Sequence, residues 1–116
     1  MAQLTEKQCV PCRGGVEPLK GEVIEQLAGQ LQPGWKVVGE HHIEREFEFK
    51  DFRQALDFVN RVGEIAEREN HHPDICLGYG KAVIQLWTHK IHGLHENDFI
   101  VAAKIDALSP GMETRQ

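Results

Sequence analysis

Residues 75–87, ICLGYGKAVIQLW, decide the fold that this sequence predicts. Two runs within this stretch alternate in character with the period of two expected of β-strands: Ile75, Leu77 and Tyr79, then Val83, Gln85 and Trp87 against Ile84 and Leu86. The dipeptide Gly80-Lys81 lies between the runs and is the right length for a tight hairpin turn. The stretch therefore predicts two antiparallel strands.

A helix and two more strands are expected upstream of this hairpin. Apolar residues recur at helical spacing from Pro18 to Leu31, Pro18 suits a first helical position, and Pro33-Gly34 stops the helix. Trp35 begins an extended segment. Residues 43–50 then alternate between apolar or arginine side chains and charged ones, which indicates a half-buried strand.

A helix is expected on each side of the 75–87 hairpin. Asp51 is placed to cap a long helix that ends near Asn70, and Gln54 completes a capping-box pattern. A last helix, apolar mainly on one side, contains residues 99–106 and ends before Ser109-Pro110. Asp98 is expected in the first turn of that helix, where its carboxylate would be stabilising.

The expected element order is α-β-β-α-β-β-α. This order predicts an α+β fold with a four-stranded antiparallel sheet and three helices on one face. At 116 residues the chain is expected to form a single domain, 1–116, with loose termini at 1–15 and 109–116, where chain breakers gather. The strand from Ala82 to Thr88 is apolar on both faces, which favours self-association.

Charge and hydropathy exclude several classes of function. The formal net charge is -5 and no basic run is present, so nucleic acid is not an expected partner. No apolar stretch approaches the ~20 residues that cross a bilayer, and residues 1–15 lack the apolar middle of a secretory signal. The three cysteines are expected to be reduced thiols in a cytoplasmic protein.

Seven histidines in so short a chain are the strongest chemical signal. His71-His72 follows the long helix, and Pro73 disfavours helix at the residue before it. Hairpin pairing sets Thr88 and His89 against the start of the preceding strand. Three imidazoles thus converge at one end of the sheet with Glu67 one helical turn away, an arrangement suited to acid and base work on a small molecule.

Other interpretations of these residues stay open at this point. The histidines could instead be loop residues that cap helices or face water, and the convergence of three imidazoles does not by itself exclude this interpretation. A zinc site is less favoured, because no two histidines lie at i, i+4 on one helix. Cys9-x-x-Cys12 lacks a second cysteine pair, and His41-His42 is interpreted as a solvated pair in a hairpin turn.

A longer pattern is more specific. It comprises Glu67-x-x-x-His71-His72-Pro73, then Tyr79, His89 and Asp98, flanked by Phe47-x-Phe49-x-x-Phe52 and by Thr88-His89 with Gly93-Leu94. This pattern resembles the signature of the pterin-4a-carbinolamine dehydratase family. One position departs from it, because His95 stands where the family usually has a Ser or Thr that caps the last helix.

The resemblance implies dehydration of 4a-hydroxytetrahydrobiopterin to quinonoid dihydropterin, the step that recycles tetrahydrobiopterin after aromatic amino acid hydroxylation. It implies a hydro-lyase without metal or other cofactor, assembled as a homodimer or homotetramer. By position, the catalytic residues would be His71, His72 and His89, and the substrate-binding residues would be Glu67, Pro73, Thr88 and Asp98.

Two rival functions remain. Animal members of the family also act as dimerisation cofactors for a transcription factor, so the chain could have a non-enzymatic binding or assembly role. It could also act on a molybdopterin-related pterin. The complete set of three histidines favours turnover over a binding role.

Overall fold

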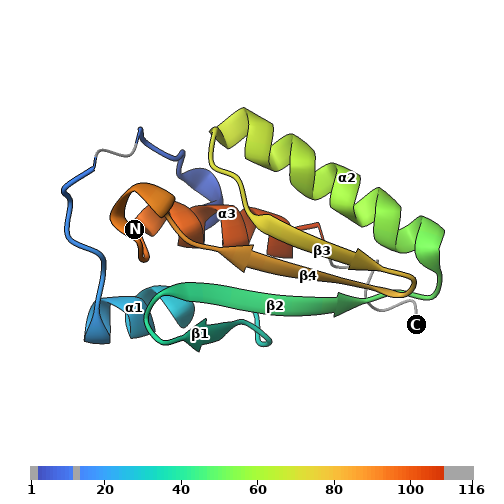
Figure 1. Cartoon of the computed structure of the whole chain (residues 1–116), viewed down its shortest axis with the longest axis horizontal. Helices are drawn as coiled ribbons and strands as arrows, with labels where there is room; N and C mark the ends of the chain where they lie inside the picture. Colours follow the sequence, from blue (N-terminus) through green and yellow to red (C-terminus); the bar gives the residue numbers. More distant parts are fainter. Residues whose placement is uncertain (1–2, 12–13, 109–116) are drawn as a thin grey trace.

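The computed structural model describes residues 3–11 and 14–108. In chain order (Figure 1) its elements are η1 Leu4–Glu6, α1 Gly21–Ala28, β1 Lys36–Val38, β2 His42–Glu48, α2 Phe52–Glu69, β3 Asp74–Gly78, β4 Lys81–Leu86, η2 His89–Ile91 and α3 Glu96–Asp106. Apart from the two short 3₁₀ turns, this is the predicted α-β-β-α-β-β-α order. In the part of the chain described, no helix is long and apolar enough to cross a membrane.

The four strands form one antiparallel sheet, as predicted, and the structure gives their order as β1-β2-β4-β3. The hairpin turn lies one residue earlier than expected, because Gly78 pairs with Lys81 and leaves Tyr79-Gly80 as the connecting residues. Tyr79 is therefore a turn residue, 73% exposed, and not a strand residue. At the other end of the hairpin Asp74 pairs with Gln85, so the chain before β3 lies beside the chain after β4.

Strand alternation places one face of the sheet in the core. On β2 the residues Ile43, Arg45 and Phe47 are buried while the residues between them are half-buried or exposed, as the alternation predicted. On β4 the buried residues Ala82, Ile84 and Leu86 point to the same face. The helices cover this face, and burial of its apolar side chains is the main contribution to stability.

Helix α1 is shorter than predicted. It begins at Gly21, not at Pro18, because the chain before it is extended and tied elsewhere. The backbone N–H of Leu19 donates to the carbonyl of Leu94 at 2.9 Å, next to α3. Gly21 then takes a left-handed conformation with φ of 55°, which a glycine accepts without strain.

Helix α2 has the start and the end that the sequence predicted. Asp51 accepts a hydrogen bond from the Gln54 N–H at 2.9 Å, which caps the first turn. The Gln54 side chain reaches back to the N–H of Lys50 at 3.1 Å instead of closing on Asp51 itself. The helix ends at Asn70, whose left-handed φ of 55° turns the chain sharply.

A buried ion pair joins the sheet to α3. Arg45 on β2 donates to Asp106 at 2.8 Å, and both side chains are less than a tenth exposed. The indole N–H of Trp35 and the backbone N–H of Gln32 also donate to the Asp106 carboxylate, at 2.9 and 3.0 Å. These bonds tie the chain around β1 to the end of α3 and compensate the cost of burying two charges.

The N-terminal segment differs from the loose terminus that was expected. Residues 3–11, called the strap below, lie along α3, and Leu4 is only 3% exposed within the core. Chain breakers alone did not indicate this docking, because it depends on contacts with residues more than 80 positions away. The expected loose segment at 109–116 lies outside the described residues.

Candidate active site

The end of α2 aims two histidines away from the helix. Because Asn70 adopts the left-handed conformation, the chain leaves the helix axis, and the His71 N–H still bonds to the Ala66 carbonyl at 3.1 Å. Pro73 follows and keeps the chain from continuing as helix. His71 and His72 therefore lie at a fixed corner between α2 and β3.

His71 is oriented by a buried carboxylate. Its Nε2 lies 2.6 Å from Oδ1 of Asp98, which is fully buried in the first turn of α3. The other carboxylate oxygen accepts from the Thr88 hydroxyl and from the His95 N–H, both at 2.9 Å. Since three donors converge on it, Asp98 acts as an acceptor, so Nε2 of His71 carries a proton and Nδ1 is available to a ligand.

His72 is oriented by a second carboxylate, this one at the surface. Its Nε2 lies 2.6 Å from Oε2 of Glu67, and the two side chains are 53% and 79% exposed. Such an exposed pair adds little stability, but it fixes the direction of the ring. The sequence analysis placed Glu67 near His71, whereas its observed partner is His72.

His89 approaches from the end of β4. It begins the short η2 turn, is exposed, and has its ring 4.0 Å from the ring of Trp87, measured between centroids. Trp87 is half-buried, and its other close ring neighbour is His41 at 4.3 Å. These two ring contacts hold the indole in place at the end of β4, beside the histidines.

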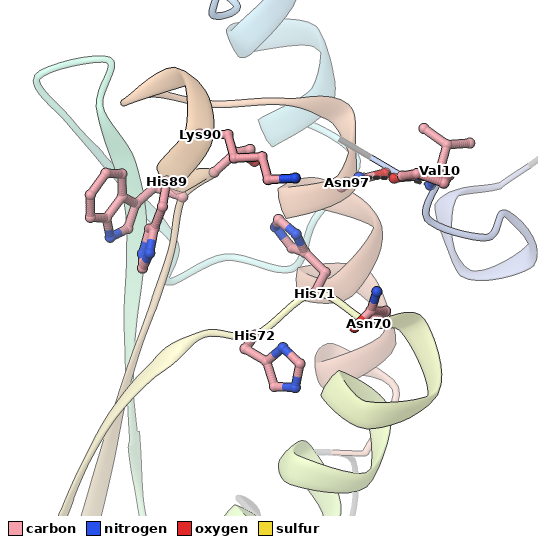
Figure 2. Close-up of a pocket in the computed structure, with 10 residues that line it drawn as sticks. Val10, Asn70, His71, His72, His89, Lys90 and Asn97 are labelled. Atoms are coloured by element: carbon pink, nitrogen blue, oxygen red, sulfur yellow. Dashed lines mark hydrogen bonds between the residues drawn. The ribbon is translucent and has the colours of Figure 1, made fainter. Parts of the chain in front are cut away.

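These residues surround a pocket of ≈ 390 Å³. The α2–β3 corner supplies Asn70, His71 and His72, the end of β4 supplies residues 87–90, and the remaining wall comes from Val10, Pro11 and Asn97. Figure 2 shows His89 and Val10 at opposite ends of the pocket with His71 between them. The volume suits a small bicyclic ligand.

The sequence-predicted residues fall into three groups. His71, His72, His89 and Thr88 line the pocket, and Asp98 lies behind it as the partner of His71. Glu67 and Pro73 instead line a neighbouring open groove of ≈ 710 Å³ that shares His72. The roles assigned to these residues remain predictions.

Several pocket residues were missed or misjudged. Val10, Pro11 and Asn97 gave no signal, because no sequence motif brings the strap to α3. His41 was expected to be solvated, yet it is half-buried against Trp87, and its Nδ1 lies 3.1 Å from Nδ1 of His42. No signal in the sequence indicated this contact, because the pairing of β2 with β4 was not predicted.

His95 does cap α3, although it departs from the expected residue type. Its Nδ1 accepts from the Asn97 N–H at 3.0 Å, and its own N–H donates to Asp98, so the capping box is complete. The position therefore keeps its structural role with an imidazole in place of a hydroxyl. In the residues described, no three His, Cys, Asp or Glu side chains are grouped so as to hold a metal ion.

The arrangement supports proton transfer to and from a small ligand. Two imidazoles each have one ring nitrogen engaged by a carboxylate, which leaves the other ring nitrogen for the ligand, and a third imidazole stands across the pocket. Imidazoles donate and accept protons near neutral pH. Acid and base catalysis at one small molecule is therefore the chemistry that this geometry can perform.

Comparison with known proteins identifies the family. The family model described as pterin 4 alpha carbinolamine dehydratase matches residues 17–108. A Rubrobacter xylanophilus protein whose name places it in this family is 66% identical over 108 residues, 93% of this chain and 100% of that protein. An Alkaliphilus metalliredigens relative with the same name is 51% identical over 91% of this chain and 96% of its own.

A solved structure agrees with the sequence relatives. The transcriptional coactivator/pterin dehydratase from Brucella melitensis superposes with a TM-score of 0.73 and 33% identity. The match covers 78% of this chain and 97% of that one. Fold, signature and relatives thus agree, and the chain belongs to the pterin-4a-carbinolamine dehydratase family.

Proposed function

We propose that the protein dehydrates a pterin-4a-carbinolamine, 4a-hydroxytetrahydrobiopterin, to the quinonoid dihydropterin and water. The observation that carries the proposal is the pocket in which His71, held at 2.6 Å by the buried Asp98, lies with His72 and His89. Family membership supplies the substrate class. The proposed setting is tetrahydrobiopterin recycling in the cytoplasm, by a homodimer or homotetramer.

The reaction needs two proton transfers and no change in redox state. One proton is delivered to the departing 4a-hydroxyl, which leaves as water, and one is removed from the adjacent ring nitrogen as a C=N bond forms. We assign proton removal to Nδ1 of His71, because the bond from Nε2 to a buried carboxylate holds the ring as an acceptor toward the ligand. His72 or His89 would supply the proton to the hydroxyl, since both are exposed and exchange protons with water.

The proposed binding residues serve orientation. Trp87 lines the pocket and would contact the pterin ring there, held in place by its two imidazole neighbours. Thr88 and Asp98 would act mainly through His71, because the Thr88 hydroxyl already donates to Asp98. Glu67 would hold His72, and Pro73 would fix the corner that both histidines share.

The test is stopped-flow absorbance of carbinolamine decay with chelator-treated protein. Wild type should accelerate the decay, and His71→Ala or His72→Ala should lower kcat by about 100- to 10,000-fold if a general base or acid is lost. Urea unfolding of each variant controls for stability. If the wild type gives no acceleration, the proposal is wrong.

A binding role is the second candidate. The Brucella melitensis neighbour is named both as a transcriptional coactivator and as a pterin dehydratase, so one fold is associated with both roles. A wild-type protein that binds a reduced pterin without accelerating dehydration would favour this role.

A further inference from the structure

The strap completes the pocket described above. Val10 and Pro11 belong to the strap and line the pocket. Figure 2 shows Val10 at the end of the pocket away from His89. Val10 is an exposed apolar side chain, 56% accessible, beside a pocket otherwise rich in imidazoles. A ligand that fills the pocket would bury the Val10 side chain, and removing an apolar group from water favours binding.

Asn97 holds the strap in register with the pocket. Its side chain accepts from the Val10 N–H at 3.1 Å and donates to the Val10 carbonyl at 2.7 Å. Asn97 is 1% exposed, so these two bonds are shielded from water. Next to it, the Cys9 N–H donates to Glu69 at 2.9 Å, and Glu69 is held in turn by Lys104 at 2.9 Å.

The two hydrogen bonds between Asn97 and Val10 determine which groups of the strap face a ligand. Both backbone polar groups of Val10 are used by Asn97, and Pro11 has no N–H to donate. At this wall the strap therefore presents the isopropyl group of Val10 and the ring of Pro11. Hydrogen-bonding side chains line the other walls of the pocket, among them the histidines, Asn70 and Lys90.

We propose that Val10 and Pro11 form a specificity wall that contacts the carbon chain of the dihydroxypropyl substituent on the pterin ring, with Asn97 as its positioning residue. The inference rests on the proposed function and adds a selectivity determinant to it. The wall lies before residue 17, where the match to the family model begins. Neither Val10 nor Pro11 has a side chain that can donate or accept a proton, so the wall acts on binding and not on the proton transfers.

The experiment compares Val10→Ala with Val16→Ala. Val16 is a matched control, since it is 44% exposed, lies in the N-terminal part of the chain and lines neither this pocket nor the neighbouring groove. Val10→Ala should raise KM for the dihydroxypropyl-substituted carbinolamine about three- to tenfold with kcat within about twofold. The preference for this substrate over the carbinolamine with a methyl substituent should also shrink. Val16→Ala should change neither value.

A double-mutant cycle with Asn97→Ala and Val10→Ala tests whether Asn97 positions Val10 through these hydrogen bonds. Asn97→Ala should raise KM as Val10→Ala does and speed hydrogen exchange at the Val10 amide, and Val10→Ala should then add little further. An effect of Val10→Ala on kcat alone, KM values equal to those of Val16→Ala, or fully additive effects would overturn the inference.

The two proposals fail in different ways. If wild type does not dehydrate the carbinolamine, the proposed function fails, and the wall is tested by titrating dihydrobiopterin while following tryptophan fluorescence. Weaker binding by Val10→Ala than by Val16→Ala would then support the wall on its own. Equal binding by the two variants would refute it.

Discussion

Replacing Asp98 by asparagine separates the catalytic role of this carboxylate from its structural one. An asparagine oxygen in place of Oδ2 can still accept from the Thr88 hydroxyl and the His95 N–H, so the capping box is retained. The amide nitrogen in place of Oδ1 would face Nε2 of His71, and two donors cannot share a hydrogen bond. His71 must then turn its ring or carry its proton on Nδ1, the atom proposed to accept from the substrate.

The expected effect on rate is large and that on stability is moderate. Loss of the correct tautomer at a general base lowers kcat by about 100- to 10,000-fold. Loss of one charge-assisted hydrogen bond lowers the free energy of unfolding by about 1.5–3 kcal/mol. That is less than the 5–15 kcal/mol typical of a small domain, so the variant should remain folded at room temperature.

Asp106→Asn is the matched control, because it makes the same substitution on the same helix. Asp106 is also buried, at 4% exposed, and accepts from Arg45, Trp35 and Gln32, but it lines no pocket. Breaking its buried pair with Arg45 should cost about 3–5 kcal/mol and leave turnover per folded molecule unchanged. The assay is stopped-flow turnover with urea unfolding of both variants. A kcat for Asp98→Asn within twofold of wild type, or an equal loss in Asp106→Asn, would refute the reasoning.

Three further predictions concern the strap and the core. Burial alone would raise the pKa of Glu69, but hydrogen bonds from the Cys9 N–H and from Lys104 outweigh it, and the pKa lies below 4.5. The ionised Glu69 therefore stabilises the fold above pH 4.5, and this stabilisation is lost as the pH falls through the folded-state pKa. Wild type and Glu69→Gln should therefore differ in urea midpoint at neutral pH and converge as the pH falls below the folded-state pKa of Glu69. Burial, then the charge of Glu69, raises the pKa of the Cys9 thiol to about 12, so peptide mapping should show iodoacetamide alkylating Cys9 at least about tenfold more slowly than the exposed Cys76. Gly34→Ala should cost about 1–3 kcal/mol in urea unfolding, because φ is +117° and the new Cβ would lie 2.9 Å from Nε of the pinned Arg45 side chain.

The order of elements could be predicted because it depends on local patterns. Alternation along residues 43–50 and 75–87 acts within a few residues, and the strands that it predicted were found, although the hairpin turn lies one residue earlier. The predicted cap at Asp51 was confirmed. Element ends were less certain where tertiary bonds decide them. Helix α1 starts after Pro18 because the extended chain before it is tied to Leu94, and neither spacing nor propensity reports that bond.

The proposed site could be predicted in part for a similar reason. Hairpin register brings Thr88 and His89 beside the chain that carries His71, so the convergence follows from strand pairing. The docking of the strap could not be predicted, because it depends on hydrogen bonds to Asn97 on α3, which is more than 80 residues away in the sequence. Stacking of His41 on Trp87 has the same origin, because it joins two strands whose pairing the sequence did not specify.

Asp98 shows why structural and functional interpretations of one residue need not compete. From its place in the sequence, Asp98 was expected to stabilise the first turn of α3. The family resemblance separately implied that Asp98 binds the substrate. In the structure one carboxylate caps the helix with one oxygen and holds His71 with the other. Because the cap fixes Asp98 in a fully buried position, the imidazole that it holds is fixed as well. The rigidity of the proposed base therefore derives from the same bonds that begin the last helix. Asp98→Asn keeps the cap and changes only the contact with His71, whereas Asp98→Ala would remove both.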